Sequence, residues 1–320
     1  LSMEELLPRA EQSLAETHTA LYETALPLYP RYLPQASSSE LADRKHVTAT
    51  VLDRLAEDRP TNATIVEQAR QTLDAATRFV RDRALMTVPD EPIEIIVMPE
   101  FQRGVAVAYC DSPGPLEVNG QTFYAISPTP ADWSAAQTES FYREYNNYML
   151  YELSVHEAMP GHYLQIAHSN EFEAPTRVRS VFWSGPFVEG WAMYAEEVMA
   201  EHGFGGPEVR MQQLKMRLRA IINAILDQKI HAGGMTEQQA MDLMLNEGFQ
   251  EQGEAAGKWR RAQLTSAQLS TYFVGYTEIA DIRRAYVARH GAITDWRAFH
   301  DRVLAFGSPP ARYVREMLGL

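Results

Sequence analysis

The stretch SVHEAMPGHYLQ, residues 154–165, carries two histidines, a glutamate and a proline in a pattern otherwise typical of a helix. In helices that bind zinc, two histidines commonly stand in the order His-Glu-x-x-His, one turn apart on one face. Here His162 follows two residues later than that order requires, and Pro160 and Gly161 lie within the interval. The stretch therefore indicates either a metal site with an insertion or a polar helix without one.

The proline between the histidines changes where their side chains point. On a straight helix His156 and His162 would lie about 240° apart around the axis and could not share an ion. Pro160 has no N–H for the carbonyl of His156, and its ring clashes with that carbonyl, so the helix must kink or bulge. Gly161 relaxes the backbone further. If the extra residues bulge outward, His162 returns to the face of His156, and we predict that the insertion preserves a metal site.

Glutamates near this stretch and downstream of it could complete such a site. Zinc binds imidazoles readily, and a catalytic site typically adds one carboxylate and keeps a position for water. Glu189, at the head of a later apolar helix, offers the carboxylate, and Glu157 beside His156 would act as general base. Glu196 returns to nearly the same face as Glu189 and could hydrogen-bond a ligand. The alternative to a metal site is a polar helix that binds no metal, in which His156 and Glu157 stand side by side by chance.

Composition argues against several classes of partner. With 45% hydrophobic and 22% charged residues, the chain of 320 residues can bury a large core. Its net charge of −13 repels phosphate, which argues against nucleic acid or an anionic membrane as the main partner. Cys110 is the only cysteine, so no intramolecular disulfide or Cys-based metal site is expected. Its side chain is expected to be a small buried or half-buried apolar group rather than a nucleophile. No apolar run approaches the about 20 residues of a membrane span. No signal-peptide pattern opens the chain, but the chain starts with Leu1, so localisation is left open.

Helical periodicity dominates the remaining sequence. Apolar residues recur at helical spacing near the N-terminus until Pro27 stops the pattern. Thr236 and Gln239 stand at the spacing of a capping box before another apolar run. The predicted helices cover residues 2–26, 37–59, 64–85, 137–168 with a break near Pro160, 177–202, 207–231, 236–247, 251–290 with an interruption allowed, and 294–305.

Three short segments lack this helical pattern of apolar residues. Residues 91–99, 105–110 and 121–128 are rich in β-branched or aromatic residues and bounded by Pro, Gly or Asp, which predicts three strands of a small sheet. The expected fold is mainly α-helical (α+β), a single domain over residues 1–320 with the sheet inserted before the helix of His156. A sheet edge beside the metal would let a peptide add as an extra strand; alternatively, all three strands pair internally.

The stretch HEAMPGHYLQ, followed by EGWAMYAEE, resembles a bacterial family known as domain of unknown function 885. Its members carry a His-Glu-x-x-x-Gly-His motif and look like zinc metallopeptidases of the gluzincin type, with two histidines and one glutamate as ligands. The later stretches IHAGGMTEQQAMDLM, QLSTYFVGYTEI and WRAFHDRVLAFGSPP are also similar to that family, so the resemblance extends over nearly the whole chain. By this likeness His156, His162 and Glu189 would hold one Zn²⁺ per chain, and Glu157 would be the base.

Two features depart from the family's pattern. Its members are often longer, with an N-terminal part that this chain lacks. We therefore expect the chain to be the C-terminal catalytic part of a longer architecture, with one wall of the cleft outside it. Met193 stands four residues after Glu189, where some gluzincins have a supporting Asp, so support for the ligands must come from elsewhere.

Five residues outside the motif could also take part in amide hydrolysis. Asp227 and His231 lie four residues apart on one helical face, so the carboxylate could orient the imidazole as a donor to the developing oxyanion. Tyr272 and Tyr276 have the same spacing, and either hydroxyl could donate instead. Arg283 lies about 20° from Tyr272 around the helix and could hold a substrate carboxylate. Each residue also has an alternative role without catalysis. Asp227 and His231 could form an ion pair on the surface, the two tyrosines could pack in the core, and Arg283 could be solvated or paired with a carboxylate.

The sequence thus predicts a zinc-dependent hydrolase, with a peptidase acting on a peptide or small amide substrate as the leading interpretation. Three alternatives stay open: a metal-retaining binding or scaffold protein without turnover, a zinc hydrolase of non-peptide amides or esters, and a helix bundle without metal. Cleavage inside or at the end of a chain, residue preference and oligomeric state do not follow from these patterns. Sites with two histidines and a glutamate also accept other divalent ions, although zinc is favoured.

Overall fold

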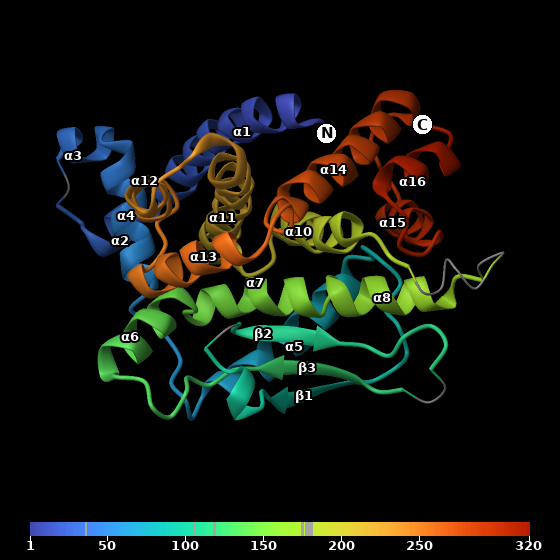
Figure 1. The fold of residues 1–320 in the computed structure, drawn as a ribbon, viewed down its shortest axis with the longest axis horizontal. Coiled ribbons are helices and arrows are strands. Elements are labelled where there is room, and N and C mark those ends of the chain that lie inside the picture. Colours follow the sequence, from blue (N-terminus) through green and yellow to red (C-terminus); the bar gives the residue numbers. More distant parts are fainter. Residues whose placement is uncertain (36, 105, 118–119, 174–175, 177–181) are drawn as a thin grey trace. The chain divides into compact units, whose positions relative to one another are not determined.

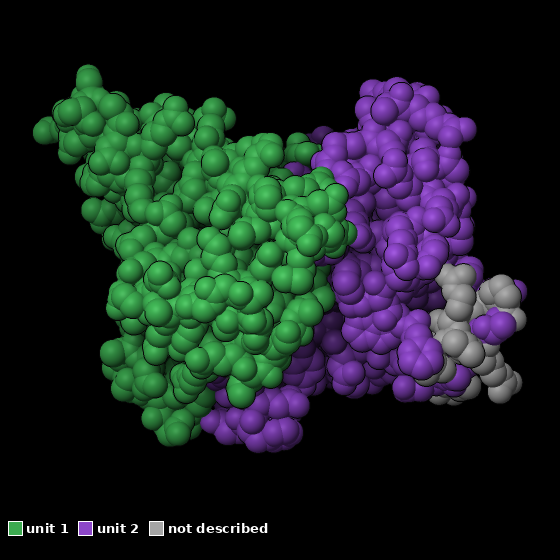
Figure 2. Space-filling model, turned by 45° about the horizontal axis from the view of Figure 1, so that its top comes forward, with its two compact units in different colours: residues 1–64, 129–152, 200–273 green, residues 65–128, 153–199, 274–320 purple. Residues whose placement is uncertain are grey.

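Helices form most of the chain in the computed structural model (Figure 1), which describes residues 1–35, 37–104, 106–117, 120–173, 176 and 182–320. The predicted class is confirmed: the fold is mainly helical, with a small mixed sheet. The chain divides into two units, coloured in Figure 2. Unit 1 contains residues 1–64, 129–152 and 200–273, and unit 2 contains residues 65–128, 153–199 and 274–320. The expectation of a single domain over residues 1–320 stays a prediction.

Unit 1 is helical throughout its regular structure. Its core contains Leu21 of α1, Leu55 of α4 and Leu218 of α11, all buried in one apolar cluster. The capping box predicted for Thr236 and Gln239 is present at the start of α12. The elements of unit 1 are α1 (Met3–Ala25), α2 (Tyr29–Tyr32), α3 (Ser38–Ala42), α4 (Arg44–Leu55), α6 (Ala135–Glu144), α11 (Gly206–Gly233), α12 (Glu237–Asp242), a π-helical turn (Leu243–Glu247) and α13 (Gln252–Leu264).

Unit 2 combines a three-stranded sheet with helices. The strand order is β1-β3-β2, in which β1 is parallel and β2 antiparallel to β3, so β2 forms an edge. α5 packs against β1 and β3. The elements of unit 2 are α5 (Ile65–Asp82), β1 (Ile93–Val97), a 3-10 turn (Glu100–Gln102), β2 (Ala108–Asp111), β3 (Thr122–Ile126), α8 (His162–Glu171), α15 (Trp296–Leu304) and α16 (Ala311–Met317). The ranges of α7 (Asn147–Glu157), α10 (Gly185–Glu201) and α14 (Ser270–His290) include residues of both units.

Polar side chains divide the predicted helices 137–168 and 251–290. The predicted helix 137–168 ends first at Glu144 and resumes as α7, because Asn146 accepts hydrogen bonds from the first N–H groups of the new helix. The predicted helix 251–290 is divided into α13 and α14, because Asp227 accepts hydrogen bonds from two N–H groups of the connecting loop and the new helix start. Short polar side chains that satisfy backbone donors favour such starts over a continuous helix.

The remaining boundaries differ from the prediction by smaller amounts. The predicted helix 37–59 is two helices, because Asp43 caps a new start at α4. α10 begins at Gly185, and the predicted helical residues 177–181 lie outside the described residues. Val105, the first residue of the second predicted strand, also lies outside them. α16 was not predicted. No helix in the described part of the chain is long and apolar enough to span a bilayer.

The part of α7 that belongs to unit 2 is fixed to the helix and sheet of that unit by a buried hydroxyl group. Ser154 Oγ lies 2.6 Å from Thr72 Oγ1 of α5 and 3.3 Å from the Tyr124 hydroxyl of β3. All three side chains are buried, so these hydrogen bonds are strong constraints on the position of the helix. Ser154 therefore fixes the turn of α7 from which His156 projects.

α10 and α14 approach each other through glycines. A Cβ atom added to Gly190 would lie 2.2 Å from the carbonyl carbon of Gly275, and one added to Gly275 would lie 1.7 Å from the Pro186 oxygen. Backbone atoms, which cannot rotate away, occupy both positions. This close crossing fixes the part of α10 that carries Glu189.

We expect Gly190→Ala to destabilise the protein by at least about 1–3 kcal/mol, the usual range for overpacking. The added methyl group must separate α10 from α14, since its nearest neighbours are backbone atoms. Denaturant unfolding measures the loss. Gly185→Ala is the matched control in the same helix, because no atom lies within 4 Å of its added Cβ. Equal stability of the two variants would contradict the close crossing.

Candidate metal centre

The helix carrying the histidine motif breaks where the sequence predicted. α7 ends at Glu157 and α8 begins at His162. The N–H of Gly161 donates to the carbonyl oxygen of Val155 at 2.8 Å, two residues beyond the ordinary helical partner. The residues between the helices therefore form a bulge.

Two contacts hold the bulge in place. A Cβ atom at Gly161 would lie 1.9 Å from the carbonyl oxygen of His156, so only glycine fits this approach. The buried Trp191 of α10 donates its indole N–H to the carbonyl oxygen of Pro160 at 2.9 Å. The bulge is thus fastened to the helix that carries Glu189.

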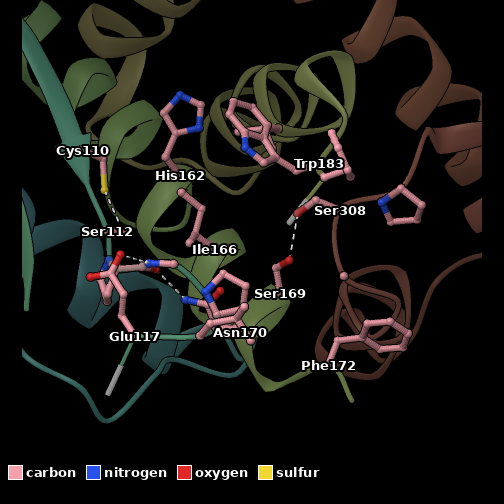
Figure 3. A pocket seen from close by; sticks show the side chains of 18 of the residues that line it. Cys110, Ser112, Glu117, His162, Ile166, Ser169, Asn170, Phe172, Trp183 and Ser308 are labelled. Atoms are coloured by element: carbon pink, nitrogen blue, oxygen red, sulfur yellow. Dashed lines mark hydrogen bonds between the residues drawn. The ribbon is translucent and has the colours of Figure 1, made fainter. Parts of the chain in front are cut away.

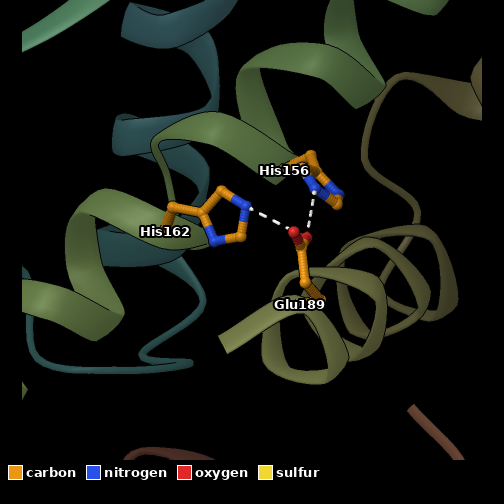
Figure 4. A group of neighbouring side chains, drawn as sticks. All are labelled: His156, His162 and Glu189. Atoms are coloured by element: carbon orange, nitrogen blue, oxygen red, sulfur yellow. Dashed lines mark ion pairs between the residues drawn. The ribbon is translucent and has the colours of Figure 1, made fainter. Parts of the chain in front are cut away.

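The bulge brings the two histidines together beside Glu189 (Figure 4). The imidazole ring centroids are 4.7 Å apart, with the planes at 83°. The Nε2 atom of each histidine lies 3.5 Å from Oε2 of Glu189. The potential ligand atoms of His156, His162 and Glu189 all lie within 4.8 Å of one another, so this group could hold a metal ion.

Atoms of this group have the properties expected of metal ligands. Oε2 of Glu189 and Nδ1 of His162 are buried, and neither has a hydrogen-bond partner among the described residues. A buried polar atom without a partner is costly, and a bound cation would relieve that cost at the carboxylate. Two imidazoles and one carboxylate are a donor set that zinc accepts. The residues present therefore fit a zinc ion.

Glu196 orients one of the histidines. Its side chain is 0% exposed, and Oε1 lies 2.7 Å from Nδ1 of His156. An ionised carboxylate only accepts hydrogen bonds, so Nδ1 of His156 donates and Nε2 is directed toward Glu189. This contact supplies support for a ligand that Met193 cannot give.

The carboxylates also set the charge of the group in the metal-free protein. Burial alone would lower the pKa of His156, but its interactions with the carboxylates of Glu189 and Glu196 outweigh burial and raise the pKa well above 6.5. Burial alone would raise the pKa of Glu189, but the two histidines hold it well below its ordinary value. The metal-free group is therefore a protonated histidine paired with ionised carboxylates.

A cavity of about 590 Å³ opens beside the group (Figure 3). His162 and Glu189 line it, together with residues from the end of β2, from α8 and from the segment after α15. This volume lies within the range typical of small-molecule sites, about 300–1,000 Å³. Two of the candidate metal ligands, His162 and Glu189, are therefore accessible to a ligand in the cavity.

Cys110 lines this cavity, and Glu157 directly follows the candidate ligand His156 in the sequence. Glu157 is half-buried, and no described residue forms a hydrogen bond or ion pair with it. Burial raises the pKa of Cys110 to about 12, and the charge of Glu157 adds to that effect. Cys110 therefore holds a protonated thiol at neutral pH and is a poor nucleophile.

His231 and Asp227 make local contacts within unit 1. Nε2 of His231 lies 2.7 Å from the carbonyl oxygen of Thr265, to which it donates, and 3.7 Å from Oδ1 of Asp227. The Asp227 carboxylate instead accepts hydrogen bonds from Ala267 and Ser270. Asp227 thus stabilises the start of α14, and catalytic roles for the pair stay predictions.

The predicted tyrosines and arginine also have local partners. The Tyr272 hydroxyl, in unit 1, accepts a hydrogen bond from Arg261 at 3.3 Å. The Tyr276 hydroxyl, in unit 2, donates to Glu197 at 2.7 Å. Arg283 lies over the ring of Trp296, 4.8 Å from its centroid, and is not among the residues that line the cavity. Roles in substrate binding or oxyanion stabilisation stay predictions for all three.

Sequence reasoning missed the contact between Trp191 and the bulge. A signal was available, because a buried indole N–H requires an acceptor and a proline-broken helix leaves a carbonyl without its helical partner.

Comparisons with known proteins identify a family and solved structures similar to this chain. A family described as bacterial protein of unknown function (DUF885) matches residues 1–318. A "putative lipoprotein of unknown function" from Shewanella oneidensis is 36% identical, with a TM-score of 0.87, and the match covers 100% of this chain and 57% of that chain. A "putative lipoprotein" from Colwellia psychrerythraea is 20% identical, with a TM-score of 0.82 and coverages of 100% and 52%, which shows the shared fold. This chain thus spans about half the length of these relatives. A comparison with curated proteins gave no match.

Proposed function

The chain belongs to the DUF885 family of bacterial proteins. We propose that it is a zinc-dependent hydrolase that cleaves peptide bonds. The observation that carries the proposal is the group of His156, His162 and Glu189 beside an open cavity. A structural metal site is usually closed by four protein ligands, whereas a catalytic one keeps a position open. Three protein ligands, of which His162 and Glu189 line a cavity, support catalysis over a purely structural role.

Each residue of the group has a defined task in this proposal. His156, His162 and Glu189 would hold the zinc ion. Zinc in such a site supplies a water of lowered pKa and polarises the substrate carbonyl. Glu157 would accept the proton of the attacking water and return it to the leaving nitrogen. Glu196 would keep His156 in the required orientation.

The edge strand β2 supports a peptide as the substrate. Within the described residues β2 pairs with β3 alone, and its last residues, Cys110 and Asp111, line the cavity. An edge strand offers main-chain groups with which an extended peptide can pair. The same surface gives no comparable advantage to a small ester or amide.

A direct test combines metal content with hydrolysis. We expect about one zinc per chain in protein purified without chelator, and cleavage of a mixed peptide library that a chelator abolishes and added zinc restores. The same assays run on small amides and esters test the alternative substrates. Zinc without cleavage of any of these would leave a metal-retaining binding protein, and folded protein that takes up no zinc would refute the proposal.

We expect metal affinity to rise with pH through the neutral range. The raised pKa of His156 means that its proton must leave before Nε2 can bind a metal. Calorimetry of zinc binding in two buffers with different ionisation enthalpies measures this proton release. In Glu196→Gln, loss of one carboxylate lowers the pKa of His156, so fewer protons should be released. Identical proton release in the two proteins would contradict this account.

The 36% identical relative from Shewanella oneidensis is described as a putative lipoprotein, and this supports a separate proposal on location. We propose that this protein acts in the cell envelope. Fractionation of source cells tests this, with recovery in the envelope fraction expected and recovery only in the cytosol contradicting it.

A further inference from the structure

One face of α8 runs from the metal group along the cavity. His162, Ile166 and Ser169 are spaced four and three residues apart, which places them on one side of the helix, and all three line the cavity. Figure 3 shows Ile166 between the other two. At 1.5 Å per residue, Ser169 lies about 10 Å along the helix from His162. The cavity therefore extends well beyond the candidate metal ligands.

The middle of this cavity is apolar. Ile166 lines it together with the aromatic residues Phe182 and Trp183, whose exposed fractions are 75% and 66%. Val188 and Phe306 line it as well. Aromatic and aliphatic side chains left open to solvent around a cavity favour burial of an apolar group of a ligand.

The far end of the same face carries an oriented polar chain. Gln165 is 1% exposed, and its side-chain N–H donates to the Ser308 hydroxyl at 2.8 Å. The Ser308 hydroxyl in turn donates to Ser169 Oγ at 2.9 Å. Ser169 Oγ thus accepts a hydrogen bond, while its own hydrogen has no acceptor among the described residues. A hydroxyl that already accepts a hydrogen bond is a stronger donor.

We propose that this face of α8 is an extended subsite for an apolar peptide segment whose distal carbonyl oxygen accepts a hydrogen bond from Ser169. An extended chain advances about 3.3–3.6 Å per residue, so the distance from His162 corresponds to about three residues. The proposal rests on the proposed hydrolysis of peptides and specifies the substrate: a chain that continues about three residues to one side of the cleaved bond, with apolar side chains.

Two nested series of apolar peptides test the subsite, one lengthened on the amino side of a central bond and one on the carboxyl side. Hydrolysis is followed with zinc-loaded protein, and binding is followed separately by fluorescence anisotropy with zinc-loaded Glu157→Gln. In one series we expect both kcat/KM and affinity to rise until about three residues are present and then to level off. Binding is measured without turnover, so it stays informative if hydrolysis fails.

Variants at Ser169 separate its hydrogen bond from general effects on the cavity. In Ser169→Ala, the increase in affinity that the third peptide residue gives should be about fivefold smaller than in the wild type, the value of one net hydrogen bond. The affinity for shorter peptides should not change. Ser169→Thr keeps the hydroxyl and should restore the gain. Glu171→Ala, on the same helix but not in the cavity wall, should behave as wild type.

The outcomes separate the subsite from the catalytic proposal. If affinity depends on peptide length and Ser169→Ala reduces it, but the wild type hydrolyses no peptide, the subsite is supported and the peptidase is refuted. Hydrolysis without dependence on length, or an equal loss for short and long peptides in Ser169→Ala, overturns the subsite and leaves the peptidase intact. Absence of both binding and hydrolysis with folded, zinc-loaded protein overturns both.

Discussion

Glu189→Ala is expected to lose bound metal, with an affinity for zinc reduced by more than about 100-fold. The reduction should exceed the 10–100-fold typical of residues that only support a ligand, because among the described residues Glu189 is the carboxylate paired with the Nε2 atoms of both histidines. Without it, two imidazoles remain as the donor set. Elemental analysis of purified protein and competition with a chromogenic chelator measure the change.

The control for this variant is Glu196→Gln. Glu196 contacts His156 through Nδ1, the ring nitrogen that does not face Glu189. Its substitution should weaken zinc by about 10–100-fold, less than Glu189→Ala. Circular dichroism establishes that both variants are folded. Retention of one tightly bound zinc by Glu189→Ala would remove Glu189 from the ligand set.

Glu157→Gln is expected to keep its zinc and to lose hydrolysis by roughly 10²–10⁴-fold, the contribution of a positioned proton-transfer group. The amide has nearly the same shape as the carboxylate but cannot accept the proton of the attacking water. No described residue pairs with Glu157, so the change should leave the fold intact. Peptide turnover and metal content measured on the same preparation test both halves of the expectation.

Asp111→Asn is the matched control for Glu157→Gln. Asp111 ends β2 and lines the cavity beside the candidate metal ligands, but it does not adjoin one of them in the sequence. It should retain hydrolysis within a few-fold of wild type. Full activity of Glu157→Gln, or an equal loss in both variants, would show that Glu157 is not the base.

The bulged histidine motif was predictable because its causes are local. Pro160 removes a backbone donor and Gly161 tolerates a close backbone approach, and both effects act within one turn of the helix. The place of Glu196 on the face of Glu189 was predictable from helical periodicity for the same reason. The three strands could be located from composition, although their pairing order could not.

The parts that could not be predicted depend on residues far apart in the chain. Asp227 interrupts the helix predicted for 251–290 from a different helix, α11. Positions 190 and 275 both require glycine because α10 and α14 cross at that point, and a side chain at either position would contact the backbone of the other helix. The cavity joins segments that no periodicity connects, such as Asp111, α8 and Ser308.

The three candidate ligands, between residues 156 and 189, all belong to unit 2. Cobalt(II) bound in their place would give a visible absorption band that reports on the integrity of unit 2 alone. Far-ultraviolet circular dichroism reports on helices of both units. Coincident loss of the two signals in denaturant would indicate one cooperative unfolding step. Loss of the cobalt band before the helical signal would show that the chain unfolds in stages, with unit 2 opening first.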